Sequence, residues 1–278
     1  MISALALSSA VLWGVWSYGT GRYGRQVSHW MVILISGSVA GLVYFLSGLL
    51  TGNLTFASED VVAGLLGGLL NLGGNVLILQ AYSRGKLGVA AGVSPAQVLI
   101  PLAYSFMLGE ALSLIAAIGI IVIFIGLVLF VLPGARGGEQ LTGGRITVLL
   151  AIASAAFYGA AVVVLDIGTR TNLYGTLTMS EVAQVLVTLV VVIAMRSGGG
   201  LTKKAVTPLA ASGIALGLGT VAFYSAADKG DVGVVSVLSS LSPIVTALMA
   251  WILLKERMSR SELVALAVVL VGTTLVVT

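Results

Sequence analysis

Apolar residues run along the chain in long, nearly uninterrupted blocks, such as Leu112 to Leu132 and Leu263 to Val277. The strands of a transmembrane barrel alternate apolar and polar residues. A helix satisfies its own backbone groups inside lipid, and it therefore tolerates continuous apolar sequence. The pattern predicts an all-α integral membrane protein.

Ten of these blocks are long enough for a span, because a hydrocarbon core needs about 20 helical residues. Turn and charged residues separate the blocks, for example at Thr51-Gly52-Asn53. The predicted spans lie near Ile2–Thr20, Trp30–Leu50, Val61–Ala81, Val89–Leu108, Leu112–Leu132, Ile146–Ile167, Leu177–Met195, Pro208–Ala227, Val232–Leu254 and Ser261–Thr278.

The two halves of the chain repeat one another. A constant offset pairs Ala81 with Ala226, Gly85 with Gly230 and Gly88 with Gly233. We therefore expect two units, residues 1–132 and 146–278, joined by a Gly-rich loop over residues 133–145. Each unit has five spans, an odd number, so the second unit enters the membrane from the opposite side. The prediction is a 5+5 inverted-topology repeat of ten transmembrane helices. Secondary transporters commonly use this plan, with the substrate site near the midplane.

Composition excludes other classes of protein. Hydrophobic residues make up 58% of the chain and charged residues 9%, whereas a soluble domain carries about 25% charged residues. A soluble enzyme and a disordered chain are therefore excluded. The chain has no cysteine and one histidine, His29, so we expect no cofactor and no metal. The N-terminus has no basic segment before its apolar run, so we expect no cleavable signal peptide.

Basic residues sit between the spans and predict the orientation. Of the 14 Lys and Arg residues, all except Arg170 and Lys229 follow odd-numbered spans. The positive-inside rule then places these loops in the cytoplasm and both termini outside. We expect the cytoplasmic membrane of a prokaryote as the location. The same distribution does not favour nucleic-acid binding.

The segment Ala226 to Pro243, with its continuation through Lys255-Glu256-Arg257, resembles the EamA family of the drug/metabolite transporter superfamily. Ala81 to Val131 repeats the pattern more loosely, and Leu12-Trp13-Gly14 resembles the family's first helix. The resemblance implies a ten-helix carrier that moves small metabolites or drugs by alternating access, often outward.

The chain departs from the family's pattern in two respects. Many members carry a basic residue early in the second helix, where this chain has Ser36, and the matching place in the seventh helix holds Glu181. Family members are also commonly drawn with both termini in the cytoplasm, opposite to the charge distribution here.

Glu181 is the sharpest candidate for chemistry. A charge at membrane depth is costly and usually faces a wet cavity or a partner. Glu181 is therefore a candidate for the coupling proton or for attracting a cationic substrate, and Gln184 lies one turn away on the same face. The alternative places Glu181 near the interface, paired with Arg170.

Asn71 and Asn75 share a face of the third predicted helix and are candidate substrate ligands. Their alternative role is interhelical hydrogen bonding. Trp13, Tyr158 and Tyr224 are candidates to line the cavity, because aromatic faces bind cations and apolar rings. The alternative is anchoring at the interface, which we favour for Trp16 and Tyr18.

Ser94 and Gln97 lie in the fourth predicted helix, which flanks the cavity in the family's plan. Pro95 and Pro243 free backbone carbonyls that could serve a ligand, or they form packing kinks. We expect structural roles for Glu110 and Glu256, with a helix-capping serine three residues after each. Asp166, Asp228 and Asp231 are expected to be solvated. The small-residue pairs Gly37/Gly41, Gly64/Gly68 and Gly213/Gly217 could pack helices within one chain or between two.

The resulting hypothesis is a secondary active transporter for a small metabolite, an amino-acid-like compound or a lipophilic cation. It would be an exporter, coupled to protons through Glu181, and not an enzyme. A lipid-precursor flippase or a nucleotide-sugar carrier of the same superfamily is the main alternative. A channel, a structural subunit or an intramembrane enzyme is less favoured. The sequence leaves a monomer and a homodimer open.

Overall fold

The structure is a computed structural model that describes residues 1–23, 27–84, 94–110, 113–136, 144–195, 203–254 and 260–277. All regular elements within these ranges are helices. They are α1 (Ile2–Tyr23), α2 (His29–Thr51), α3 (Ser58–Arg84), the 3-10 helix η1 (Ser94–Val98), α5 (Leu99–Met107), α6 (Leu114–Arg136), α7 (Gly144–Thr169), α8 (Leu173–Ala194), α9 (Lys203–Ala227), α10 (Val232–Ser239), α11 (Ser242–Leu254) and α12 (Arg260–Val277).

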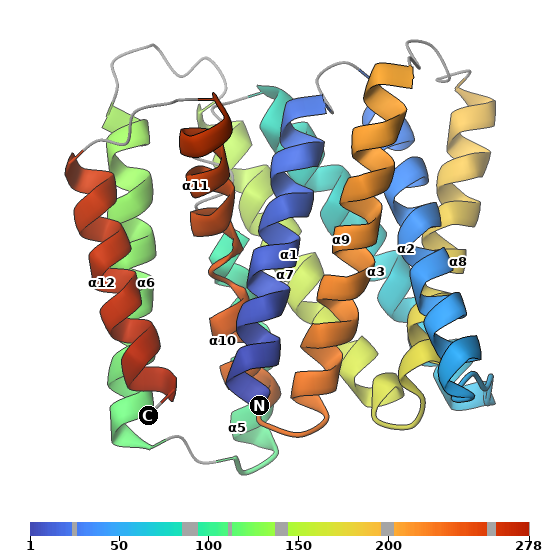
Figure 1. The fold of residues 1–278 in the computed structure, drawn as a ribbon, viewed down its shortest axis with the longest axis horizontal. Helices are drawn as coiled ribbons and strands as arrows, with labels where there is room; N and C mark the ends of the chain where they lie inside the picture. The colour runs from blue at the N-terminus through green and yellow to red at the C-terminus, as the bar shows by residue number, and fades with distance from the viewer. Residues whose placement is uncertain are drawn as a thin grey trace.

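Seven segments of the described chain are long and apolar enough to cross a membrane, and three further apolar helices are shorter. The helices stand side by side, and both ends of the chain lie at the same end of the bundle (Figure 1). We call this the termini end and the other the opposite end. The all-α membrane class is confirmed, whereas the count of ten spans stays a prediction.

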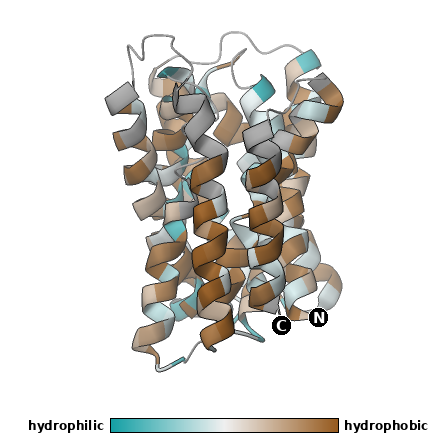
Figure 2. Ribbon diagram, turned by 90° about the vertical axis from the view of Figure 1, so that its left-hand side faces the viewer, coloured by the Kyte–Doolittle hydropathy of each residue, from teal (hydrophilic) through white to brown (hydrophobic). Residues whose placement is uncertain are grey.

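Hydrophobic side chains cover the outside of the bundle. Figure 2 shows mainly hydrophobic ribbon on the helices that face the viewer. Along α2, Leu42, Leu46 and Leu49 are exposed, and so are Leu186, Val190 and Ile193 along α8. An apolar surface of this extent is expected for a protein that faces lipid.

The segment that continues α9 toward the opposite end is broken. It consists of α10 and α11, separated by Ser240 and Leu241. Pro243 is the second residue of α11, where the missing N–H costs no helical hydrogen bond. The earlier segment is similarly divided into η1 and α5. Breaks of this kind in membrane helices expose backbone groups near the centre of the bundle.

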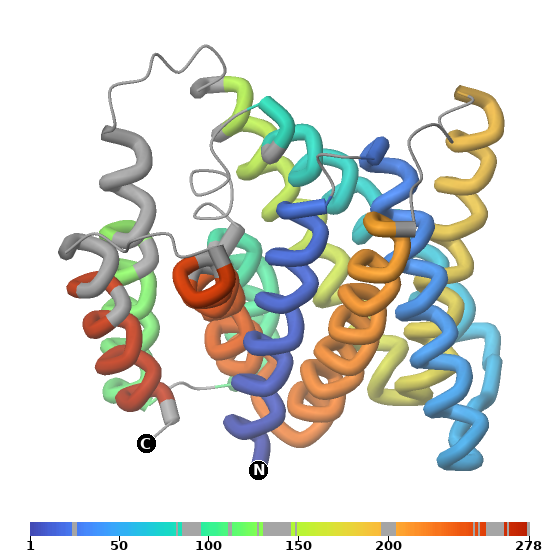
Figure 3. The backbone as a smooth tube through the Cα atoms, turned by 45° about the horizontal axis from the view of Figure 1, so that its top comes forward, coloured from blue at the N-terminus to red at the C-terminus, as the bar shows by residue number. Residues whose placement is uncertain are grey.

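Glycines set the helix packing. α1 lies along α9, α3 along α7 and α8, α2 along α8 and α9, and α6 pairs with α12 at one edge (Figures 1 and 3). A Cβ atom at Gly68 would lie 2.2 Å from the backbone oxygen of Ser180, and one at Gly213 would lie 2.5 Å from that of Ser36. These two small-residue pairs therefore pack helices within a single chain.

The termini end corrects one expectation and confirms another. Asp166 is fully buried, not solvated, because Arg170 covers it through an Nε–Oδ2 ion pair of 2.9 Å. Arg170 therefore forms its ion pair with Asp166 in this structure. Ser113 caps α6 as expected, since its Oγ accepts a hydrogen bond from the Ala116 N–H at 3.1 Å.

Asp231 is likewise not simply solvated. Its Oδ1 atom caps α10 by accepting from the Gly233 and Val234 N–H groups at 2.6 and 3.1 Å. The Ser105 hydroxyl at the end of α5 donates to the same oxygen at 2.9 Å. Asp228 is exposed, as expected.

Candidate functional site

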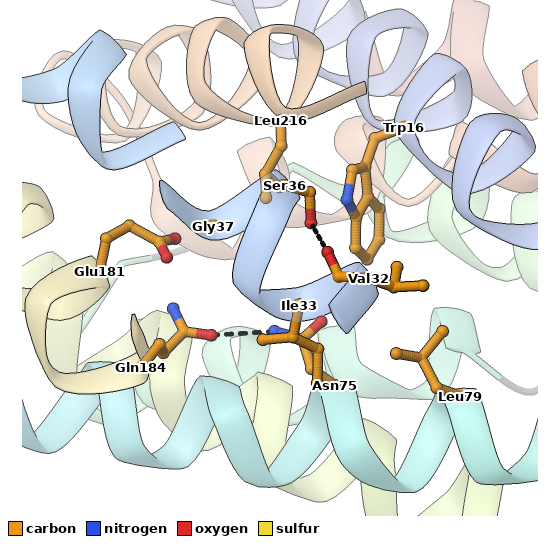
Figure 4. Close-up of a pocket in the computed structure, with 10 residues that line it drawn as sticks. All are labelled: Trp16, Val32, Ile33, Ser36, Gly37, Asn75, Leu79, Glu181, Gln184 and Leu216. Atoms are coloured by element: carbon orange, nitrogen blue, oxygen red, sulfur yellow. Dashed lines mark hydrogen bonds between the residues drawn. The ribbon is translucent and has the colours of Figure 1, made fainter. Parts of the chain in front are cut away.

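A small pocket lies between five helices that come from both halves of the chain (Figure 4). Its volume of about 10 Å³ is close to the least that one water molecule occupies. The pocket therefore has no room for a substrate molecule in this conformation. The lining residues are Trp16, Val32, Ile33, Ser36, Gly37, Asn75, Leu79, Glu181, Gln184 and Leu216.

A chain of hydrogen bonds fixes the polar wall of the pocket. The Tyr158 hydroxyl of α7 donates to Asn75 Oδ1 of α3 at 2.8 Å. Asn75 Nδ2 in turn donates to Gln184 Oε1 of α8 at 3.0 Å, which is the bond drawn in Figure 4. This series of hydrogen bonds joins the two halves of the sequence, because α3 precedes the Gly-rich segment and α7 and α8 follow it. It orients the Gln184 amide so that its nitrogen points away from Asn75.

Glu181 lies one turn before Gln184 and is only 4% exposed. Its Oε2 atom has no hydrogen-bond partner among the described residues, and neither has Gln184 Nε2. In Figure 4 the Glu181 carboxylate extends toward Gly37. An ionised carboxylate with an unpaired oxygen is expensive to bury, and a proton or a bound cation would lower that cost.

The glycine pair on α2 makes room for this carboxylate. A Cβ atom at Gly37 would lie 2.9 Å from Glu181 Oε2, and one at Gly41 would lie 3.1 Å from Glu181 Cβ. Gly37 and Gly41 are thus a third small-residue pair that acts within one chain. Their particular effect is to bring α2 against a titratable side chain.

Trp16 is the aromatic residue of the pocket, and its indole Nε1 is buried without a hydrogen-bond partner in the described chain. Trp13, three residues earlier on α1, is not part of the pocket lining. Its Nε1 donates to Thr220 Oγ1 of α9 at 3.2 Å, and its ring stacks on Phe223 with centroids 5.2 Å apart. Phe223 meets Tyr224 edge-on at 4.8 Å. Trp13 therefore belongs to the α1–α9 contact, and Tyr224 packs against Phe223 of its own helix outside the pocket lining.

Comparison with known proteins identifies the family. The sequence model of the EamA-like transporter family matches residues 1–132 and 145–278. The chain belongs to the EamA-like transporter family. Its members are membrane transporters, so the resemblance seen in the sequence is confirmed, and the protein is an integral membrane protein.

A solved structure has the same fold as this EamA-like protein. It is the crystal structure of a protein 21% identical in sequence, with a TM-score of 0.81, over 99% of this chain and 95% of that chain. At this identity the likeness establishes the fold alone. No curated protein sequence matches the chain.

Among the other sequence candidates in this EamA-like transporter, Asn71 and Gln97 lie outside the pocket lining. Asn71 is half-buried one turn from Asn75. The backbone oxygen of Gln97 faces α7, 2.5 Å from where a Cβ at Gly159 would stand. Ser94 begins η1, but its side chain lies outside the described residues. A role in substrate binding stays a prediction for each of them.

Sequence reasoning did not select Trp16, Gly37 or Leu216 for the pocket. The spacing of Gly37 and Gly41 indicated close packing, yet nothing in it showed that Glu181 would be the neighbour. Ser36 stood out only as a departure from the family. In the structure it is buried, and its hydroxyl donates to the Val32 carbonyl at 2.8 Å.

Proposed function

We propose that this protein is a secondary transporter that works by alternating access, built as two five-helix units in inverted topology. The helix contacts support this plan. In this plan each element of the first unit corresponds to one of the second. In order, the elements of the first unit are α1, α2, α3, η1–α5 and α6, and those of the second are α7, α8, α9, α10–α11 and α12. Exchanging the two units then turns the α1–α9 contact into the α3–α7 contact, and the α2–α9 contact into the α3–α8 contact, and both members of each pair are observed. The same exchange leaves the α2–α8 and α6–α12 contacts unchanged. A pseudo-two-fold axis through the bundle centre gives this pairing.

Glu181 is the proposed coupling group. The observation that carries this assignment is its carboxylate oxygen, which is buried in the pocket without a partner in the described chain. A charge at this depth costs about 3 kcal/mol on insertion scales. A proton, or the cationic group of a substrate, would remove that cost. We propose that the two bind Glu181 in turn, which couples substrate export to proton entry.

The substrate class that fits is a small metabolite or amino-acid-like compound with a cationic group, or a lipophilic cation. Glu181 would meet the positive charge, and Trp16 offers an aromatic face elsewhere in the lining of the same pocket. Asn75 and Gln184 would supply hydrogen bonds once the Tyr158 chain rearranges. Since the pocket has no room for a substrate here, binding requires that the surrounding helices separate.

For orientation, we propose that both termini face outside. Among the described residues, Arg22, Arg84 and Lys204 lie at helix ends on the opposite side of the bundle from the termini. The positive-inside rule assigns that side to the cytoplasm. Arg136, Arg145, Lys203 and Arg260 also lie at helix ends. The other basic residues of the orientation argument, Arg25, Lys86, Arg196, Lys255 and Arg257, lie outside the described residues.

The test uses purified protein in liposomes that contain a pH-sensitive dye. Amino acids, quaternary ammonium compounds and sugars are added in turn, and substrate-driven proton movement is followed. We expect a saturable signal for a cationic or zwitterionic compound, lost in Glu181→Gln. The matched control is Glu59→Gln, the same change at an exposed position in the first turn of α3. A Glu181→Gln signal equal to that of the control would refute the assignment.

A further inference from the structure

Three buried polar atoms in the pocket lining have no hydrogen-bond partner in the described chain. They are Glu181 Oε2, Gln184 Nε2 and Trp16 Nε1. Glu181 and Gln184 belong to α8, whereas Trp16 belongs to α1. A carboxylate oxygen accepts hydrogen bonds, and amide and indole nitrogens donate them. The pocket therefore holds one unpaired acceptor and two unpaired donors.

The other polar side chains of the lining are already paired. The Ser36 hydroxyl donates to the Val32 carbonyl at 2.8 Å. Asn75 accepts from the Tyr158 hydroxyl at 2.8 Å and donates to Gln184 Oε1 at 3.0 Å. The three unpaired atoms are therefore the ones that a ligand would meet.

These three atoms are turned toward the interior of the pocket. In Figure 4 the Glu181 carboxylate extends toward Gly37, and the Gln184 nitrogen lies on the Glu181 side of its amide group. The Trp16 nitrogen lies on the edge of the indole ring that faces Ser36. One donor thus stands one turn from the carboxylate on α8, and the other stands on a different helix.

The charge of the lining is simple. Glu181 is the single ionisable side chain among the described residues that line the pocket. A proton or one cationic group neutralises it. A ligand with a carboxylate of its own would leave a net negative charge, which the described lining residues do not balance, and an unbalanced charge inside a membrane is costly. The charge therefore fits a substrate with one positive group and no negative group.

The two donors set a second condition. Gln184 is 2% exposed, and Trp16 Nε1 is buried. A ligand that displaces water from such groups loses affinity if it cannot replace the hydrogen bonds of that water. Sites with buried polar groups accordingly reject analogues that lack the matching group. A carbonyl or hydroxyl oxygen can accept two hydrogen bonds, so the donors fit a substrate that carries such an oxygen.

We infer that the substrate is an amine with a single positive charge and an uncharged carbonyl or hydroxyl group. Glu181 binds the ammonium group, and the N–H groups of Gln184 and Trp16 bind the oxygen. This inference rests on the proposed role of Glu181 and narrows the substrate class. Amino acid amides and amino alcohols meet both conditions. Zwitterionic amino acids fail the condition on charge, and hydrocarbon cations fail the condition on the donors.

The experiment compares ligands that share a carbon skeleton. For the alanine, leucine and phenylalanine skeletons, the compounds are the amino acid, its primary amide, the amino alcohol and the amine that lacks the carboxyl carbon. Binding to the full-length protein in detergent at pH 7 is measured from the rise in melting temperature with ligand concentration. For at least one skeleton, we expect the amide or the amino alcohol to bind about tenfold more tightly than the amine. It should also bind more tightly than the amino acid.

A pair of tryptophan variants tests the assignment of the donors. Trp16→Phe removes an N–H group that has no partner in the described chain and keeps an aromatic ring. We expect the preference for the amide over the amine to fall about fivefold. Trp13→Phe is the matched control, since it loses the hydrogen bond to Thr220 and lies outside the pocket lining. It should lower the melting temperature and keep the full preference.

The inference is overturned if no skeleton has an amide or amino alcohol that binds more tightly than both the amine and the amino acid. Failure of every compound to bind is included in that result. An unchanged preference in Trp16→Phe also overturns it.

This outcome is independent of coupling, because binding in detergent needs no proton gradient. If the ligands bind in the expected order and Glu181→Gln still moves protons with substrate, the coupling role fails and the substrate class stands. If coupling is lost in Glu181→Gln and the ligands bind in another order, only the substrate class is refuted.

Discussion

Two regions of the molecule treat a carboxylate in opposite ways. At the termini end, Asp231 Oδ1 accepts three hydrogen bonds, from the Gly233 N–H, the Val234 N–H and the Ser105 hydroxyl. In the pocket, Glu181 Oε2 accepts none from the described residues, although the side chain is 4% exposed. The sequence places Glu181 inside an apolar helix and Asp231 between two helices, but it does not show which of the two carboxylates has hydrogen-bond partners.

The difference sets a carboxylate with a structural role apart from the one that we propose to be functional. The partners of Asp231 belong to α5 and α10, so the carboxylate holds these two helices together and needs no ligand. Glu181 instead lies against Gly37 and Gly41, whose missing side chains leave space for its carboxylate. Burying a carboxylate oxygen without a hydrogen-bond partner costs free energy. At membrane depth, ionisable residues that carry this cost usually have a function.

Among the variants that keep Glu181, one that fills the space beside it should have the largest effect on transport. In Gly37→Ala the new Cβ would stand 2.9 Å from Glu181 Oε2, so the carboxylate must move while the backbone stays. A hydrogen bond to a charged group contributes about 1.5–3 kcal/mol, or about 10- to 100-fold in affinity. We expect a loss of that size in the apparent affinity for substrate, measured by uptake into liposomes.

Leu42→Ala, on the lipid-facing side of the same helix, is the control for a change to alanine away from the pocket and should transport normally. A Gly37→Ala protein with unchanged uptake kinetics would mean that the space beside Glu181 has no function.

Breaking the chain that orients Gln184 should have a smaller effect. Asn75→Leu removes the bonds to both Tyr158 and Gln184. Each is worth about 1 kcal/mol, so about fivefold in substrate affinity is expected for the bond that bears on the pocket. Tyr158→Phe removes only the outer bond and should change the affinity less. An equal effect of the two variants would show that Asn75 does not act through Gln184.

Removing the satisfied carboxylate should affect stability rather than transport. Asp231→Ala loses the cap of α10, which costs about 1 kcal/mol, together with the link to Ser105. We expect a lower melting temperature in detergent and unchanged substrate affinity in the protein that remains folded. Asp231→Asn keeps a capping oxygen and should be intermediate. A change in affinity without a change in stability would contradict the structural role.

The smallest effect is expected at Glu110, next to Asp231 in the turn after α5. Burial, and then the neighbouring Asp231 carboxylate, raise the pKa of Glu110 above its usual 4.5. The folded state therefore binds more protons than the unfolded state just above pH 4.5, and its stability falls as the pH rises through the raised pKa. Glu110→Gln should raise the melting temperature slightly at neutral pH and leave it unchanged below pH 4.5. A rise of equal size at acid pH would exclude this cause.

Helix positions could be predicted closely from hydropathy. The first span was expected over Ile2–Thr20, and α1 covers Ile2–Tyr23. The seventh was expected to begin at Leu177, whereas α8 begins at Leu173. The reason is that Asn172 caps it, with Oδ1 accepting from the Gly175 N–H at 2.6 Å. Hydropathy reports the apolar block and does not register a polar cap one turn outside it.

Part of the candidate site was also predictable. Asn75, Tyr158, Glu181 and Gln184 are polar or aromatic groups inside apolar helices, and the structure brings them together. The exchange of Trp13 for Trp16 could not be foreseen. Residues three apart on a helix differ by a small rotation, and the crossing of α1 with α9 decides which of them points inward. Asp166 was misjudged because position near a span end says nothing about an arginine one turn later.

The most direct test of the account is whether substrate binding releases a proton from Glu181. Purified protein in weakly buffered detergent solution is mixed with the compound that gives a saturable signal in liposomes, and the pH of the solution is recorded. The account predicts acidification with the unmodified protein and with Glu59→Gln, and none with Glu181→Gln. Proton release of the same size from Glu181→Gln would contradict it.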